Sequence, residues 1–144
     1  MLCDEDFRLG GRLLAENYQI DSRPARDWVE AAEAELASLP DCRVLRRTTV
    51  QGVYDGGTYA AIERVNDHVP TPAAHEPRQR LWRIVAKCAV LAAGAIERPI
   101  VFGDNDRPGV MLAGAVRAYL NRYGVAPGKR AVIFADNEDR KSVV

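Results

Sequence analysis

The sequence lacks the features that mark several large classes of protein. Its three cysteines are odd in number, lie far apart and form no C-x-x-C pair, so neither a disulfide framework nor a zinc site is expected. Basic and acidic residues balance at twenty each, which favours neither a nucleic-acid partner nor an anionic membrane surface. No apolar run approaches the roughly 18 residues of a membrane-spanning helix, and the first residues do not resemble a signal peptide. These absences predict a cytoplasmic protein that binds neither nucleic acid nor membrane.

Motifs of the common catalytic centres are also missing. The sequence contains no nucleophile elbow, no phosphate-binding P-loop and no cluster of metal ligands. His68 and His75 flank a proline-rich stretch without a ligand-like partner, and we interpret both as surface residues. Asp104, Asp106 and Arg107 are better explained as a solvated turn with an ion pair than as a catalytic group. We therefore predict no catalytic and no metal-binding residue in this chain.

Hydrophobic periodicity predicts two helices. The first has apolar residues at spacings of three and four and ends before Pro40; its stripe consists of Ala25, Trp28, Val29, Ala32 and Leu36. The second follows residue 109, runs to Tyr123 and has Gly124 as its C-terminal cap. Residues 10–21 are predicted to form a loop with one helical turn.

Runs of β-branched and aromatic residues predict an antiparallel β-meander within residues 42–87. A glycine-rich turn joins its first two strands, and the three strands are expected at residues 48–54, 59–65 and 81–85. Two further runs, residues 88–93 and 131–135, are continuously apolar, as strands buried on both faces of a sheet are. Residues 2–3 are interpreted as the end of a buried strand.

The order of these elements predicts an α/β protein. The expected fold is a partial, three-layer Rossmann-like FAD/NAD(P)-binding fold with the meander as a small insertion, lacking the first strand and the glycine-rich loop. We expect residues 1–109 to form a truncated first dinucleotide-binding domain. Residues 110–138 would hold a connecting helix and the first strand of a second nucleotide domain, and residues 139–144 a non-native tail. Because the first strand is central in a doubly wound sheet, such a chain is expected to be unstable alone.

Two acidic residues and two glycines near the N-terminus form the first part of the candidate site. Asp4 and Glu5 follow a strand end, where a carboxylate in a dinucleotide-binding fold accepts hydrogen bonds from a ribose diol. Gly10 and Gly11 come shortly afterwards, and their missing side chains allow a cofactor to approach the backbone. Two acidic residues before such a glycine pair are more often a solvated turn.

Two later pairs of residues complete the candidate site. Ala93 and Gly94 end an apolar run in a small-residue loop that is able to lie close to a pyrophosphate. Thr49 and Val50 lie where the chain of such a fold passes the adenine. Tight packing of a strand end and an ordinary β-branched strand are the alternatives that the residues leave open.

Taken together, several runs resemble the alpha subunit of heterotetrameric sarcosine oxidase. The runs that carry the resemblance are LCDED at 2–6, GGRLL at 10–14, RTTV at 47–50, GAIERP at 94–99, NDRPGVMLAGAVR at 105–117 and YLNRYGV at 119–125. A shared fold alone would not reproduce the last three. The resemblance extends from residue 2 to residue 137 but covers a small central part of a much longer subunit, so we expect the chain to be an interior fragment.

The resemblance implies a function for the parent complex and a smaller role for this segment. The family oxidatively demethylates sarcosine to glycine, formaldehyde and hydrogen peroxide in a hetero-oligomer. FAD and FMN are expected in that complex, and NAD in this subunit, which is similar to the disulfide-reductase-like flavoproteins. By the same resemblance Asp4 binds the adenosine ribose with help from Glu5, Gly10 to Arg12 lie along the cofactor, Val50 borders the adenine, and Gly94 closes the site.

Two departures from the family pattern limit what the resemblance implies. The glycine-rich turn whose following helix binds the pyrophosphate is missing, so the fragment alone is not expected to bind NAD well. Asp136 and Asn137 bring no glycines where a second phosphate-binding loop would lie. Two alternatives remain: a non-catalytic scaffold that holds a nucleotide and docks partner subunits, or a subunit of a related amine or opine dehydrogenase or hydrogen cyanide synthase.

Overall fold

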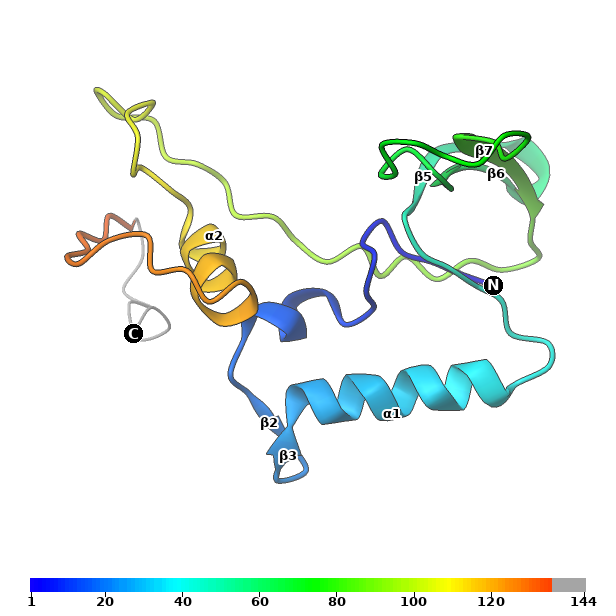
Figure 1. The fold of residues 1–144 in the computed structure, drawn as a ribbon, viewed down its shortest axis with the longest axis horizontal. Coiled ribbons are helices and arrows are strands. Elements are labelled where there is room, and N and C mark those ends of the chain that lie inside the picture. Colours follow the sequence, from blue (N-terminus) through cyan, green and yellow to red (C-terminus); the bar gives the residue numbers. More distant parts are fainter. Residues whose placement is uncertain (136–144) are drawn as a thin grey trace. The chain divides into compact units, whose positions relative to one another are not determined.

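The computed structural model describes residues 1–135, which divide into two compact units. The first consists of residues 1–11 and 27–93, and the second of residues 12–26 and the described chain from Gly94 onward (Figure 1). The predicted division into residues 1–109 and 110–138 stays a prediction. The predicted tail, together with Asp136 and Asn137, lies outside the described residues. No helix within residues 1–135 is long and apolar enough to cross a membrane.

A short β-α-β arrangement opens the first unit. Strand β1 (Leu2–Cys3) pairs in parallel with β4 (Val44–Leu45), and helix α1 (Ala25–Ser38) lies between them in the chain. Parallel strands need such a crossover connection, so this arrangement is that of an α/β protein. Val29 on α1 and Leu45 on β4 are buried, whereas Trp28, which we placed in the apolar stripe, is 47% exposed. The predicted helix is confirmed.

Glu33 ties this arrangement together. Its Oε1 accepts a hydrogen bond from the backbone N–H of Leu9 at 3.2 Å, and its Oε2 lies 3.1 Å from Nη2 of Arg46. One carboxylate on α1 therefore holds both the loop that follows β1 and the residue that follows β4.

The predicted antiparallel meander is confirmed. Strands β5 (Thr48–Tyr54), β6 (Thr58–Arg64) and β7 (Gln79–Val85) form one sheet in the order β5-β6-β7 (Figure 1). The turn between β5 and β6 is η2 (Asp55–Gly57), where Gly56 and Gly57 have φ of 66° and 68°. Such values favour glycine, which explains the pair of glycines in the turn. The register shifts between Val50 and Gly52, so β5 contains a bulge.

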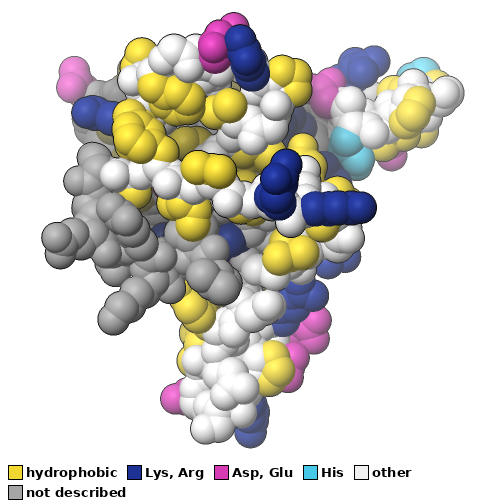
Figure 2. Space-filling view, turned by 90° about the vertical axis from the view of Figure 1, so that its left-hand side faces the viewer, with side chains coloured by type: hydrophobic (Ala, Val, Ile, Leu, Met, Phe, Trp, Pro, Cys, Tyr) yellow, Lys and Arg dark blue, Asp and Glu magenta, His cyan; other side chains and the backbone are white. Residues whose placement is uncertain are grey.

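The two runs predicted to be buried strands are not strands in the structure. Residues 88–93 have no regular secondary structure and are exposed, with Leu91 92% accessible, and residues 131–135 include Val132, which is 99% accessible. An apolar strand needs hydrogen-bonding neighbours on both edges. Within residues 1–135 no strand pairs with either run, so that part of the prediction is wrong for this structure. Figure 2 shows hydrophobic side chains at the surface of the face that it presents.

The second unit contains short elements. It begins with the single helical turn expected, η1 (Gly11–Ala15), and continues into a hairpin that we did not predict, β2 (Gln19–Ile20) paired with β3 (Arg23–Pro24). Asp21 and Ser22 in its turn have φ of 51° and 63°, the left-handed conformation that tight hairpins require. This turn lacks the usual glycine, which is why the sequence did not reveal it.

The second predicted helix is present in the same unit. Helix α2 (Ala113–Arg117) continues into a π-helical turn, η3 (Ala118–Arg122). Gly124, with φ of 68°, donates its N–H to Leu120 O at 3.1 Å, and Val125 N donates to Tyr119 O at 2.8 Å. These are the hydrogen bonds of a glycine C-cap, as predicted.

Candidate functional site

Asp4 lies at the carboxyl end of β1, between β4 and the start of β5. Its N–H donates to Leu45 O at 2.9 Å, and its carbonyl oxygen accepts from Thr48 N at 2.8 Å. Its carboxylate Oδ1 accepts from Asp6 N at 2.8 Å, which closes a local turn. No residue within 1–135 forms a hydrogen bond with the other carboxylate oxygen. One acceptor of Asp4 therefore remains available for a ligand.

The structure brings Thr49 and Val50 into the neighbourhood of Asp4. Both follow Thr48 on β5, where Thr49 is paired with Ile62 and Val50 with Ala61. Their side chains are exposed, Val50 by 45%. The register shift of β5 comes directly after Val50.

The loop after β1 places Glu5 and the two glycines. Glu5 is exposed, and its carbonyl oxygen accepts a hydrogen bond from Nη2 of Arg64 at 2.9 Å. Gly10 and Gly11 have φ of 117° and 49°. A Cβ added to Gly11 would meet no atom within 4 Å, so the positive φ of this residue accounts for the glycine and protein packing does not. The backbone of Gly11 is exposed, so a ligand is able to approach it.

The remaining candidate residues are not gathered in the same unit. Ala93 is the last residue of the first unit, whereas Arg12 and Gly94 belong to the second. Ala93 and Gly94 are both exposed, and Gly94 has φ of 71° with nothing within 4 Å of an added Cβ. A conformational requirement therefore accounts for this glycine, and close packing does not.

A pocket of about 450 Å³ lies beside the candidate residues of the first unit, and we call it the β1-end pocket. It is lined by residues 5–7, Arg47, Arg64 and residues 67–68, and it is open to solvent. Ligands of α/β sheets bind outside the carboxyl ends of the strands, and this pocket is at such an end. His68, which we interpreted as a surface residue, is exposed at its rim.

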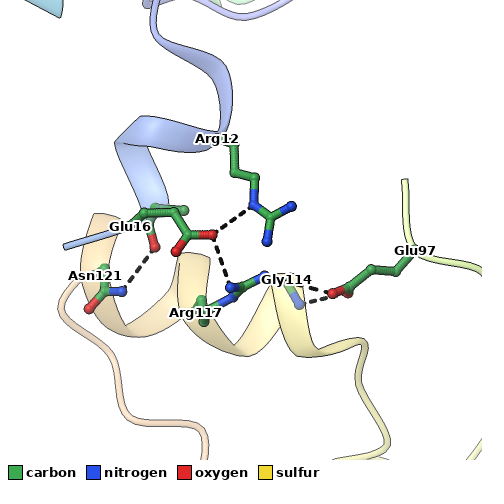
Figure 3. Close-up of polar contacts among 7 residues, drawn as sticks. Arg12, Glu16, Glu97, Gly114, Arg117 and Asn121 are labelled. Carbon is green, nitrogen blue, oxygen red and sulfur yellow. Dashed lines mark hydrogen bonds and ion pairs between the residues drawn. The ribbon is translucent and has the colours of Figure 1, made fainter. Parts of the chain in front are cut away.

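Arg12 takes part in a polar cluster within the second unit. Its Nε donates to Oε1 of Glu16 at 2.7 Å, and Nη1 of Arg117 lies 2.9 Å from the same oxygen. Figure 3 shows these three side chains pointing toward one another. The Glu16 side chain is only 6% exposed, whereas that of Arg12 is 68% exposed. The hydrogen bond to Glu16 and then its negative charge raise the pKa of Arg12 above its ordinary value.

Further contacts of α2 and η3 extend this cluster. Glu97 accepts the N–H of Gly114 at 2.7 Å, and Nδ2 of Asn121 donates to Ala15 O at 2.9 Å (Figure 3). Residues 12–26 are therefore held to the helix by side chains that sequence reasoning missed. The available signal was the spacing of four between Arg117 and Asn121, which puts both on one helix face.

Residues 104–107 form the exposed turn with an ion pair that the sequence predicted. Nη2 of Arg107 lies 3.0 Å from Oδ2 of Asp104, and their side chains are 71% and 65% exposed. An exposed ion pair of this kind contributes little to stability.

Comparison with solved structures shows which known fold this chain is similar to. The chain is similar to L-proline dehydrogenase from P. horikoshii, with a TM-score of 0.67 and 27% sequence identity over 88% of this chain and 24% of that one. The fold of this chain is therefore similar to that of one segment of this dehydrogenase. No family model matches the chain.

Comparison with curated sequences is more specific. The chain is 56% identical to sarcosine oxidase subunit alpha of Rhizobium meliloti (strain 1021) over 96% of its residues. It is 47% and 46% identical to the subunits of that name from Corynebacterium sp. strains P-1 and U-96, over 100% and 96% of its residues. It spans 14% to 15% of the length of these relatives. The predicted resemblance is confirmed: the chain is homologous to one segment of sarcosine oxidase alpha subunits.

Proposed function

We propose that this chain supplies part of the nucleotide-binding region of a sarcosine oxidase-like alpha subunit and contributes no catalytic group itself. The observation that carries this proposal is the position of Asp4 at the carboxyl end of β1. There β1 is paired in parallel with β4, and the first residue of β5 donates to the Asp4 carbonyl. In dinucleotide-binding folds a carboxylate at such a strand end accepts a hydrogen bond from a ribose hydroxyl.

The residues present fit a dinucleotide. Asp4 keeps one carboxylate oxygen for a hydroxyl donor, and Gly11 leaves room at its backbone. The nucleotide proposed is NAD, held in the first unit by Asp4, Glu5, Gly10, Gly11, Thr49, Val50 and Ala93. Arg12 and Gly94, which belong to the second unit, are proposed for NAD from the resemblance alone. Side chains and backbone groups of this chain would orient the ribose and the adenine of the bound NAD. In the parent complex FAD and FMN are proposed to supply the redox chemistry.

The wider role is proposed from the curated relatives. Their name, subunit alpha, supports assembly with other subunits. The parent complex would oxidatively demethylate sarcosine to glycine, formaldehyde and hydrogen peroxide in the cytoplasm. A second candidate is an amine dehydrogenase that acts on another substrate, which the likeness to L-proline dehydrogenase supports. Peroxide production from O2 by the whole complex with sarcosine supports the first candidate, whereas reduction of an added dye acceptor with L-proline, without peroxide, supports the second.

The nucleotide-binding proposal is tested with the full-length subunit in its complex. Asp4→Asn is expected to weaken NAD binding roughly ten-fold or more, since a hydrogen bond to a charged group is worth about 1.5–3 kcal/mol. Asp41→Asn, at an exposed carboxylate outside the candidate site, is the matched control and should bind NAD normally. Calorimetry gives the affinity, and the NAD content of the purified complex gives an independent value.

Two results would count against the proposal. Equal NAD affinity in the Asp4 variant and the control would exclude Asp4 as a ribose ligand. An NADH absorption band that appears during turnover with sarcosine would show that the nucleotide takes part in the chemistry, contrary to the holding role proposed here.

A further inference from the structure

One face of the meander exposes hydrophobic side chains. Successive residues of a strand point to opposite faces of the sheet, and the exposure of β7 follows this alternation: Trp82 and Ile84 are half-buried, whereas Leu81, Arg83 and Val85 are exposed. Leu81 and Val85 are each 69% exposed. Neighbouring apolar side chains that are exposed in this way often mark a site of protein interaction.

Pairing across the sheet adds Tyr54 of β5 to the same face. Tyr54 is opposite Thr58 of β6, which is opposite Val85 of β7, and residues paired in this way share a face. The next row of paired residues on this face consists of Gly52, Ala60 and Arg83. We call this side of the sheet the open face; its exposed residues are Tyr54, Leu81, Arg83 and Val85.

The ring of Tyr54 lies against Gly52. A Cβ added to Gly52 would be 2.7 Å from the Tyr54 hydroxyl oxygen and 2.8 Å from Cε2 of the ring. Gly52 does not have a positive φ, so its backbone conformation does not require glycine. Glycine weakens a strand unless something approaches it closely, and here the Tyr54 ring does. A tyrosine ring that is 62% exposed is therefore held against the sheet and has little freedom left to lose.

Arg83 lies on the open face without a partner of opposite charge. Two nearby arginines are paired: Arg80 lies 2.9 Å from Glu63, and Arg78 lies 3.1 Å from Asp67. No residue within 1–135 forms an ion pair with Arg83, although residues 53–55, 58–60 and 81–83 line one groove of about 670 Å³ that includes the Asp55 turn. An arginine that is covered without a carboxylate is strongly destabilising. Whatever covers this face should therefore bring a carboxylate to Arg83.

The composition of the open face favours a contact between chains. Arginine is almost never fully buried inside a folded chain unless it is paired, whereas tyrosine and arginine are enriched at interfaces between proteins. A few such residues supply most of the binding energy of an interface. The curated relatives are named subunit alpha, which supports the presence of other subunits.

We propose that the open face docks another subunit of the complex, through a surface that presents a carboxylate among apolar side chains. The carboxylate would pair with Arg83, and the apolar side chains would pack on Tyr54, Leu81 and Val85. This inference rests on the proposed function in one respect, because it needs the alpha subunit to assemble with other subunits. It does not involve the β1-end pocket.

Arg83→Lys makes the occupant identifiable by chemical cross-linking of the whole complex. A carbodiimide joins a lysine amine directly to a carboxylate in contact with it, and mass spectrometry then identifies the two peptides. We expect a new link from position 83 to an aspartate or glutamate of another subunit. Arg23→Lys, at an exposed arginine of the β2–β3 hairpin, is the control and should give no such link. A link to the same alpha chain or to a second alpha chain, or no link at all, overturns the inference.

Two further variants measure how much the open face contributes to assembly. Arg83→Glu should weaken association of the full-length alpha subunit with the remaining subunits roughly 30-fold or more, as loss of one partner of a buried charge pair does. Gly52→Ala displaces only the outer end of the Tyr54 side chain. It should weaken association roughly five-fold and leave the melting temperature of the alpha subunit unchanged. Arg23→Glu is the matched control, and analytical ultracentrifugation measures association.

The other outcomes are distinguishable from one another. If Arg83→Glu associates as tightly as Arg23→Glu, the open face is not in an interface and the inference fails. If Arg83→Glu lowers the melting temperature of the alpha subunit and leaves association unchanged, the same chain covers the face. If the unchanged alpha subunit does not associate with other subunits at all, the proposed assembly fails together with this inference, while the proposed binding of NAD is unaffected.

Discussion

The turn between β5 and β6 gives a sharp test of the structure, because two adjacent glycines differ in their surroundings. A Cβ added to Gly57 would lie 2.4 Å from the carbonyl oxygen of Ala86, whereas one added to Gly56 would meet nothing within 4 Å. Both glycines have similar φ, 66° at Gly56 and 68° at Gly57. Substitution by alanine therefore costs the same backbone strain at the two positions, and only Gly57→Ala adds a collision with the backbone.

The magnitudes follow from these contacts. An alanine in the left-handed conformation destabilises the folded chain by about 1–2 kcal/mol. Replacing glycine also reduces the conformational freedom of the unfolded chain, which offsets about 0.4–1 kcal/mol of that cost. Gly56→Ala should therefore destabilise the meander by about 1 kcal/mol. Gly57→Ala must also displace Ala86, whose N–H donates to Gly57 O at 2.9 Å. Loss of that hydrogen bond adds about 1 kcal/mol, before any cost of the collision itself.

Amide hydrogen exchange in the full-length subunit measures the difference locally. The amides of β6 and β7 should exchange at least about five-fold faster in Gly57→Ala than in Gly56→Ala, because about 1.4 kcal/mol corresponds to a factor of ten. Exchange in α2 and η3 serves as an internal reference and should not change. Equal protection of β6 and β7 in the two variants would show that the chain does not approach Gly57 as described.

Three further predictions concern side chains. Glu16→Gln should destabilise the contact between residues 12–26 and α2 by about 1.5–3 kcal/mol, because it removes the closer of the two carboxylates that lie near the Arg117 guanidinium. Arg107→Gln, at an exposed ion pair, should cost less than about 1 kcal/mol. Limited proteolysis of the full-length subunit compares the two variants, and equal susceptibility contradicts the burial of Glu16. Hydrogen bonds from Gln79 and then from Arg78 lower the pKa of Asp67. The contribution of Asp67 to stability is therefore present above the ordinary Asp pKa and is lost as the pH falls through the lowered pKa. In an NMR titration Arg78→Gln should move the pKa of Asp67 back upward, and an unchanged midpoint would exclude the contact. Trp82→Phe removes the indole N–H that donates to the Glu63 carboxylate on β6 at 2.7 Å, and it should destabilise the meander by about 1 kcal/mol. Amide hydrogen exchange of β6 and β7 measures this loss, and unaltered protection would mean that the hydrogen bond is absent in solution.

Local patterns predicted the elements that depend on local physics. The stripe of α1, the glycines of the β5–β6 turn and Gly124 after η3 all act over a few residues, and each was found where the sequence placed it. The hairpin at residues 19–24 was missed because Asp21 and Ser22 are held in left-handed conformations that the sequence did not signal.

The candidate site was predictable only in part, for a related reason. The strand end at Asp4 and Glu5 could be located from the change from apolar to polar residues, and the structure places the start of β5 beside it. The conformation of Arg47, with φ of 54°, and its position over Phe7 were not predicted, because a one-dimensional pattern records neither. The role of Glu16 was equally hidden, since it joins Arg12 to Arg117 across more than a hundred residues.

The sequence by itself determined the homology to sarcosine oxidase alpha subunits, the helices α1 and α2, and the meander, because shared runs, periodicity and turn chemistry are properties of neighbouring residues. Only the tertiary structure decided which side chains meet and whether an apolar run becomes a strand. Residues 88–93 and 131–135 have the composition of buried strands, yet neither run forms a strand, and residues 88–93 and 131–134 are exposed. A strand forms through hydrogen bonds to another segment, so composition favours it but a neighbouring strand must complete it.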